Sequence, residues 1–164
     1  MERKVLWAPW RGEYVSGKKD PGCIFCPPEG PLPDPERLIL YRDENVLVIM
    51  NKFPYNVGHL LISPRRHVAN LEDLTEKELL YMMRMCQEAI KILRKVLNPH
   101  GFNVGFNLGK VAGAGYPDHI HLQLVPRWEG DVNFLAVLDE VRVVSTHLKT
   151  MYEKLFPLFQ EVKL

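Results

Sequence analysis

The stretch His119-Ile120-His121-Leu122-Gln123-Leu124-Val125, closed by Pro126-Arg127, alternates polar and apolar side chains. Alternation of this kind over β-forming residues predicts a single strand with two different faces. We expect its isoleucine and two leucines to face the core. The two histidines and the glutamine would then lie on the opposite face, roughly 6–7 Å apart from one to the next.

Two imidazoles and an amide on one strand face form no hydrophobic surface, and they indicate a place where a substrate is handled. The alternative is a half-buried strand whose solvent face carries two histidines, because short patterns recur by chance. The context favours the first interpretation. Asn107 and a glycine-rich stretch, residues 109–115, come before the strand, and Pro126-Arg127 follow it.

With this context, the H-x-H-x-Q pattern followed by P-R resembles the signature of the histidine-triad (HIT) superfamily. Gln123 stands where most members carry a third histidine. This variant is typical of the nucleotidyl-transferring branch, which contains dinucleoside polyphosphate phosphorylases and galactose-1-phosphate uridylyltransferases. The resemblance extends over residues 7–128. It points to the phosphorylases, since the uridylyltransferases are much longer chains in which two such domains are fused.

The order of the expected elements predicts an α+β fold. Residues 37–41 and 46–50 flank Asp43-Glu44-Asn45 and indicate a hairpin, and residues 60–62 form a further apolar run that Pro64 stops. Two more strands are expected at residues 102–108 and 119–125. This matches the fold that the resemblance implies: a mainly antiparallel sheet of about five strands, with a long helix packed on it and a C-terminal helical segment.

The long helix has a recognisable start. Thr75, with Glu78 three residues later, forms a capping-box pattern, and residues 98–101 end the helix. Between them, apolar residues at alternating spacings of three and four predict the buried face. They are Leu79, Met83, Cys86, Ile90, Leu93 and Leu97. We expect Cys86 to be a small buried hydrophobic residue.

The length of 164 residues fits a single domain, 1–164. Residues 1–36 would form an N-terminal arm and a metal loop, and residues 130–164 a C-terminal extension that is mainly helical over 133–156. The chain is 46% hydrophobic and 25% charged, which is typical of a globular protein. A net charge of +1 gives no indication of nucleic-acid or membrane binding. We expect a cytoplasmic protein, because the chain has neither a long apolar run nor the pattern of a signal peptide.

A metal site is suggested by Cys23-x-x-Cys26. The spacing alone is ambiguous, because redox pairs share it. Zinc in proteins prefers four thiolate and imidazole ligands, and composition cannot choose among the six histidines. These are His59, His67, His100, His119, His121 and His147. The resemblance implies a particular set, namely Cys23, Cys26, His67 and His119. A full shell of this kind makes the zinc structural.

The chemistry that the resemblance implies centres on His121. In the family, the middle histidine attacks the α-phosphate of a nucleotide while a backbone carbonyl holds its other nitrogen, and a covalent nucleotidyl-histidine results. Gln123 can donate a hydrogen bond to a phosphate oxygen but cannot titrate. A site without a second base suits leaving groups and acceptors that are already anions, such as a nucleoside polyphosphate and inorganic phosphate.

Several residues are candidates for binding the nucleotide. By resemblance, Asn51 would bind a ribose hydroxyl, although it could be a strand-end turn residue. Asn107 would supply an active-site amide, although asparagine next to glycine is often only a turn former. The backbone N–H groups of Gly113, Ala114 and Gly115 could cradle phosphates. Trp128 could line the nucleotide pocket, as could Trp7 and Trp10.

The sequence therefore predicts a nucleotidyltransferase that cleaves dinucleoside tetraphosphates with inorganic phosphate as acceptor, a phosphorylase. The family resemblance implies a homodimer. A hydrolase of dinucleoside polyphosphates or nucleoside phosphoramidates is the alternative within the same family. An alternative of another class is a zinc-stabilised module that binds nucleotides without turnover, although such a module would not require a nucleophile at His121.

Overall fold

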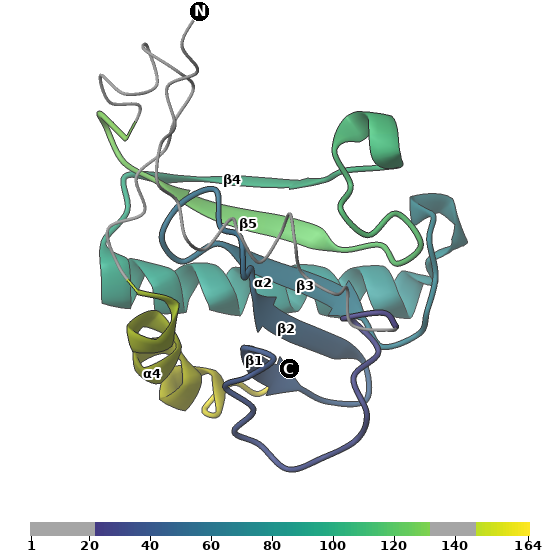
Figure 1. The fold of residues 1–164 in the computed structure, drawn as a ribbon, viewed down its shortest axis with the longest axis horizontal. Helices are drawn as coiled ribbons and strands as arrows, with labels where there is room; N and C mark the ends of the chain where they lie inside the picture. The colour runs from purple at the N-terminus through teal and green to yellow at the C-terminus, as the bar shows by residue number, and fades with distance from the viewer. Residues whose placement is uncertain (1–21, 132–146) are drawn as a thin grey trace, which may run out of the picture.

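The computed structural model describes residues 22–131 and 147–164. The centre of the molecule is a five-stranded sheet in the order β1-β2-β3-β5-β4, in which every neighbouring pair is antiparallel (Figure 1). Its strands are β1 (Ile39–Arg42), β2 (Val46–Met50), β3 (Leu60–Pro64), β4 (Gly101–Phe106) and β5 (Leu122–Arg127). The predicted α+β class and the number of strands are confirmed.

The two faces of the sheet carry different clusters. Val48, Leu60 and Ile62 point into the main core, which lies between the sheet and its helices. The residues that alternate with them on the same strands, Leu47 and Leu61, join a smaller cluster that also contains the fully buried Phe25. The segment that carries the two cysteines is therefore packed on the side of the sheet opposite the long helix.

The long helix, α2 (Glu76–Leu97), begins with the predicted capping box. The Thr75 side chain accepts from the Glu78 backbone N–H, and the Glu78 carboxylate accepts from the Thr75 backbone N–H. The helix ends at Asn98, which adopts a left-handed conformation with φ of 46°. Both ends are set by local residues, and both were predicted correctly.

The predicted buried face of α2 is correct only in part. Cys86 and Leu93 are buried as expected, but Leu79 and Met83 are 38% and 48% exposed. The buried positions are Met82, Met85, Cys86, Ala89, Ile92 and Leu93. Apolar residues occupy adjoining positions around much of this helix, so spacing admits more than one stripe. Packing on the sheet selects between them.

A C-terminal helix, α4 (Leu148–Phe159), covers the edge of the sheet at β1. The Tyr152 hydroxyl donates to the backbone carbonyl of Ile39 over 2.9 Å, and the Gln160 amide donates to that of Leu40 over 2.7 Å. These bonds satisfy acceptors that an edge strand leaves unpaired. The helix confirms the expected C-terminal helical segment, while the part predicted at 133–146 lies outside the described residues.

The seven-residue strand predicted at 119–125 is wrong at both ends. The strand begins at Leu122 and continues through Pro126 to Arg127. Its pairing with β3 stops at Ile62 opposite Leu122, although β3 itself continues to Pro64 in its pairing with β2. In place of a ladder, the residues before Leu122 make isolated backbone bonds, from the Ile120 N–H to the Val68 carbonyl at 2.7 Å and from the His119 N–H to the Tyr116 carbonyl at 3.5 Å.

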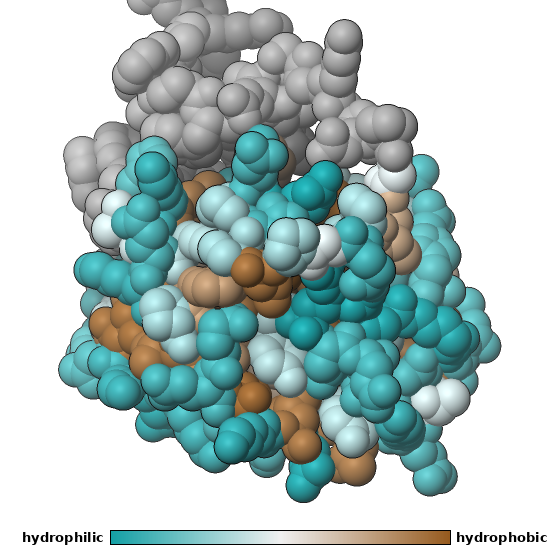
Figure 2. Space-filling view, turned by 90° about the horizontal axis from the view of Figure 1, so that it is seen from below, coloured by the Kyte–Doolittle hydropathy of each residue, from teal (hydrophilic) through white to brown (hydrophobic). Residues whose placement is uncertain are grey.

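The surface is mostly hydrophilic in the view of Figure 2, where hydrophobic residues lie in separate patches among polar ones. Within residues 22–131 and 147–164, no helix combines the length and the apolar character needed to cross a membrane.

Candidate active site and metal centre

The two histidines of the motif lie where β3 and β5 separate. Both are buried, with exposed fractions of 1% for His119 and 7% for His121. Ile120 between them points into the main core and is 4% exposed. The predicted alternation therefore holds although the segment is not a strand, because a buried apolar residue still separates the two rings.

His121 is held by its backbone neighbour. Its Nδ1 lies 2.9 Å from the carbonyl oxygen of His119. A carbonyl can only accept, so the proton is on Nδ1 and the lone pair of Nε2 is available. Burial lowers the pKa of His121, while this hydrogen bond acts in the opposite direction. The ring is therefore a neutral imidazole near pH 7, the form that can act as a nucleophile.

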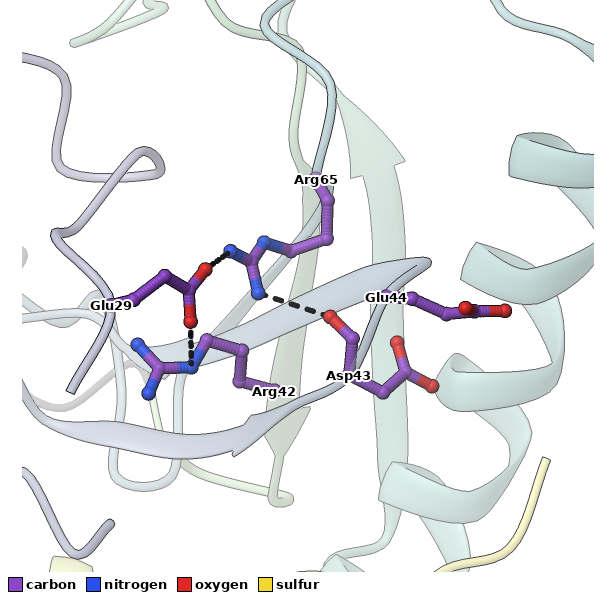
Figure 3. A pocket seen from close by; sticks show the side chains of 5 residues that line it. All are labelled: Glu29, Arg42, Asp43, Glu44 and Arg65. Atoms are coloured by element: carbon purple, nitrogen blue, oxygen red, sulfur yellow. Dashed lines mark hydrogen bonds and ion pairs between the residues drawn. The ribbon is translucent and has the colours of Figure 1, made fainter. Parts of the chain in front are cut away.

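The segment after the cysteines is tied to the sheet by two arginines (Figure 3). Arg65, after β3, donates to the Glu29 carboxylate over 2.6 Å and to the Asp43 carbonyl over 3.0 Å. Arg42, on β1, donates to the backbone carbonyls of Pro28 and Gly30. These contacts fix the path of the chain just beyond Cys26.

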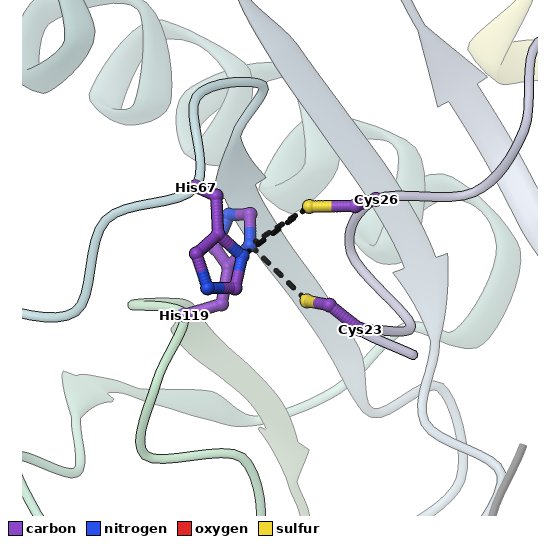
Figure 4. Close-up of side chains that lie close together, drawn as sticks. All are labelled: Cys23, Cys26, His67 and His119. Carbon is purple, nitrogen blue, oxygen red and sulfur yellow. Dashed lines mark hydrogen bonds between the residues drawn. The ribbon is translucent and has the colours of Figure 1, made fainter. Parts of the chain in front are cut away.

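The four predicted metal ligands lie together, with their ligand atoms all within 4.8 Å of one another (Figure 4). His119 Nδ1 is 3.3 Å from the Cys23 sulfur and 3.5 Å from the Cys26 sulfur. The Nδ1 of His67 is 3.4 Å from the Cys26 sulfur. We refer to Cys23, Cys26, His67 and His119 as the metal cluster.

The geometry of the metal cluster fits zinc. Tetrahedral coordination with usual Zn–S and Zn–N bonds places sulfur and nitrogen ligands about 3.5 Å apart, close to the distances observed. The Nε2 of His119 lies 3.0 Å from the Pro64 carbonyl, so Nε2 carries the proton and Nδ1 faces the sulfurs with its lone pair. A ligating histidine commonly has such a carbonyl partner. Burial lowers the pKa of His119 to about 4, which keeps it neutral.

The Cys23 thiol needs a cation nearby to ionise at neutral pH. Burial is the largest effect on Cys23 and raises its pKa to about 11, so that without a metal the group is a thiol at neutral pH. Thiolate is the form that binds zinc, and the ion displaces the proton. All three cysteines within residues 22–131 are free of disulfides.

Gln123 lies on β5 next to a buried histidine that the sequence suggested only as a possible zinc ligand. His59 is 1% exposed, and its Nδ1 accepts from the Tyr55 backbone N–H over 3.1 Å, which leaves the proton on Nε2. Burial lowers the pKa of His59 to about 4, and a contact with the Gln123 side chain acts against this shift. That contact falls short of a normal hydrogen bond. His59 is therefore neutral, and it lies next to Gln123, the third polar residue of the motif.

Asn51 follows β2 and forms part of the loop that leads to His59. Its side-chain oxygen accepts from the Phe53 N–H over 2.9 Å, and its Nδ2 lies 3.2 Å from His59 Nδ1. Asn51 therefore has the role of a turn residue that the sequence left open. Binding of a ribose hydroxyl would use the second hydrogen of its Nδ2, and that role stays a prediction.

Asn107 and Gln123 line one groove of about 310 Å³ on the open side of β4 and β5. The Asn107 amide also packs beside Gly113, about 3.4 Å from where a β-carbon would be. The Gly113 and Ala114 N–H groups donate to the carbonyls of Lys110 and Gly109. These bonds use the donors expected to cradle phosphate, so that expectation now rests mainly on Gly115.

Trp128 follows directly after β5, at the end of the strand away from His121. Its position seven residues beyond His121, mostly along an extended strand, separates the two by roughly 20 Å. The Trp128 N–H donates to Asp131 in the following turn. A role for Trp128 in lining the nucleotide pocket stays a prediction. Trp7 and Trp10 lie outside the described residues.

Sequence reasoning missed Phe25. Its ring stacks on that of His121, with centroids 4.7 Å apart and planes at 24°. The available signal was an aromatic residue between two cysteines of a suspected metal loop. Nothing in the spacing says that this loop reaches the motif histidines.

The comparisons with known proteins agree with this geometry. The model of the HIT domain family matches residues 34–130. A relative from Mycobacterium tuberculosis, described as "AP-4-A phosphorylase", is 40% identical over 152 residues, 88% of this chain and 78% of that protein. The asymmetrical bis(5'-nucleosyl)-tetraphosphatase of Schizosaccharomyces pombe is 31% identical over 57% of this chain and 50% of its own length.

Solved structures show the same fold. A zinc-bound histidine triad family protein from Mycobacterium smegmatis superposes with a TM-score of 0.62 at 28% identity, covering 76% of this chain and 84% of that one. A HIT family member from Bacillus subtilis gives 0.53 at 26% identity, covering 68% and 74%. The family model, the relatives and the shared fold together show that this chain belongs to the HIT family.

Proposed function

We propose that this protein is a nucleotidyltransferase of the phosphorylase type, which cleaves dinucleoside tetraphosphates with inorganic phosphate as acceptor. The observation that carries the proposal is the pairing of a neutral His121 with a non-titrating Gln123 on the same segment. The 40% identity to a protein described as AP-4-A phosphorylase supports the same reaction.

In the first step, Nε2 of His121 attacks the α-phosphorus of one nucleotide. A P–N bond forms while the phosphoanhydride P–O bond breaks, and a nucleoside triphosphate leaves as an anion. The His119 carbonyl accepts from Nδ1 throughout, and so stabilises the positive charge that develops on the ring. The Gln123 amide donates to a phosphate oxygen as charge builds there.

In the second step, an oxygen of inorganic phosphate attacks the same phosphorus and the P–N bond breaks. The electron pair returns to Nε2, and a nucleoside diphosphate is released. Phosphate is an oxyanion near neutral pH, so this step needs positioning and neutralisation of charge rather than a general base. The groove that Asn107 and Gln123 line lies on the side of the site where an acceptor could enter.

Zinc bound in the metal cluster would have a structural role. Two thiolates and two imidazoles fill a tetrahedral shell, so no position stays open for a substrate or an activated water. The ion would join the cysteine loop to His119, the residue whose carbonyl holds the nucleophile.

The test is to incubate the protein with a dinucleoside tetraphosphate, with and without inorganic phosphate, and to identify the products. Phosphorolysis gives a nucleoside diphosphate and a triphosphate only when phosphate is present. Release of monophosphate without phosphate would favour the hydrolase, and no turnover at all would favour the binding module.

We also propose that the protein is a homodimer that pairs through β4. This strand is bonded only to β5 in the described residues, whereas α4 covers the other edge of the sheet. Val104 on β4 is 44% exposed and Leu108 beyond it 49%. An open edge with apolar side chains is a template for strand addition. Light scattering should give the mass of a dimer for the wild type and of a monomer for Val104→Lys.

A further inference from the structure

Phe25, between the two cysteines of the metal cluster, is fully buried and packs on the motif histidines. Its ring centroid lies 4.7 Å from that of His121 and 5.2 Å from that of His119. The plane of the His121 ring is inclined at only 24°, so the two rings are stacked. The loop that carries two metal ligands therefore covers one face of the imidazole to which we assign the attack.

The stacking contact with Phe25 adds a second restraint on the orientation of the His121 ring. The hydrogen bond from Nδ1 to the His119 carbonyl holds one edge of the ring, but a single bond at an edge leaves the ring able to tip. A flat aromatic side chain against its face opposes that motion. The direction of the Nε2 lone pair is thus set by a hydrogen bond and a stacking contact together, and a misplacement of about 1 Å can reduce a rate by about a hundredfold.

Phe25 is itself held from two sides. It packs into the small cluster on this face of the sheet, with Leu47 and Leu61 among its members. Its neighbours in sequence, Cys23 and Cys26, close a turn through a 3.0 Å backbone hydrogen bond and direct their sulfurs at His119. A cation in the metal cluster would hold both cysteines beside His119, and so would hold the Phe25 ring between them against His121.

We propose that Phe25 is a positioning residue for the nucleophile, through which occupancy of the metal cluster sets the orientation of the His121 ring. The proposal rests on the proposed function, in which His121 attacks the substrate. Phe25 makes no contact with the reacting phosphate in this scheme and acts through His121 alone.

The test compares Phe25→Leu, which keeps a buried apolar group but removes the flat ring, with Ile24→Ala. Ile24 lies in the same loop and packs against the same small cluster. We expect Phe25→Leu to lower kcat by about tenfold to a hundredfold, with KM changed by less than about threefold and metal content unchanged. Ile24→Ala should keep kcat near the wild-type value. If Phe25→Leu fails to fold, Phe25→Met serves in its place.

The link to the metal has a readout that needs no turnover. Carbethoxylation of His121 by diethyl pyrocarbonate, followed by peptide mass spectrometry, reports access to its ring. Removal of the metal from the wild type should speed this modification, and Phe25→Leu with metal bound should show the same faster rate. Metal removal should then add little in the variant. Equal effects of metal removal in both proteins would overturn the proposal.

The two proposals fail in different ways. Wild-type turnover combined with full kcat in Phe25→Leu overturns the positioning role and leaves the phosphorylase intact. A wild type without turnover overturns the phosphorylase, while the carbethoxylation rates still decide whether Phe25 and the metal control the His121 ring.

Discussion

The carbonyl oxygen of His119 lies 2.9 Å from Nδ1 of His121, and the ring of the same His119 faces the sulfurs of Cys23 and Cys26. One residue thus belongs to the metal cluster through its side chain and to the nucleophile through its backbone. The segment leaves the sheet at this point, which frees the carbonyl from any ladder. The departure from the predicted strand is therefore what lets the carbonyl hold the catalytic ring.

His121→Ala should abolish cleavage of a dinucleoside tetraphosphate, because the proposed covalent intermediate forms on Nε2 of this residue. Nucleotide binding should weaken by no more than about 1–2 kcal/mol, since it rests on other contacts. Product assays and calorimetric titration measure the two effects. Activity above about a hundredth of the wild-type value would rule out the covalent mechanism assigned to this residue.

Metal-replete protein should contain one zinc ion per chain by elemental analysis, and a strong chelator should lower the melting temperature, because metal binding is coupled to folding. Cys26→Ser should lose the metal. Cys86→Ala is the matched control, since that thiol is buried in α2 away from the metal cluster. Full zinc content in Cys26→Ser would show that the four residues are not the ligands.

Local signals account for what the sequence predicted well. The capping box of Thr75 and Glu78 involves residues three apart, and the left-handed Asn98 needs only its own short side chain to end the helix. The metal ligands were instead predicted from the family resemblance, because the sequence alone does not choose among the six histidines. A pattern that depends on neighbours in sequence can be read directly from the chain.

Long-range packing accounts for what was missed. The buried stripe of α2 includes Met82 and Met85 rather than Leu79 and Met83, and packing against the sheet and α4 decides this. The stacking of Phe25 on His121 joins the cysteine loop to a segment far along the chain. Neither the packing of α2 nor the stacking of Phe25 on His121 produces a periodicity or spacing that can be recognised in the sequence.

Gly58→Ala should destabilise the fold, because Gly58 has a φ of +76° and an added β-carbon would lie 2.6 Å from Cδ1 of Leu97. Strain and overlap together suggest a loss of about 2 kcal/mol or more in the free energy of unfolding. Denaturant titration measures it. Gly101→Ala is the control, since no atom lies within 4 Å of its β-carbon. Equal stabilities of the two variants would contradict the prediction.

Low pH should remove the stabilisation that the ionised Glu78 side chain gives at the N-terminal end of α2. The pKa of Glu78 is about 2, below the ordinary 4.5, mainly because the Arg66 guanidinium donates to its carboxylate. A folded-state pKa below the unfolded one stabilises the fold above about pH 4.5, and the gain is lost as the pH falls toward 2. The melting temperatures of wild type and Glu78→Gln should therefore differ near neutral pH and converge near pH 2. Glu72→Gln, at an exposed carboxylate, should melt as the wild type does at both pH values.

Gln123→His should shift the products of tetraphosphate cleavage from diphosphate toward monophosphate. Water must lose a proton when it attacks the nucleotidyl-histidine, and a histidine at this position could accept it, whereas the wild-type amide cannot. The wild type should depend on added phosphate, because an oxyanion needs no base. Gln123→Asn is the control, since it cannot titrate either and should slow the reaction without changing the product ratio. Chromatography of the nucleotides at several phosphate concentrations measures that ratio. Rapid release of monophosphate by the wild type in phosphate-free buffer would overturn this role for Gln123 and identify the protein as a hydrolase.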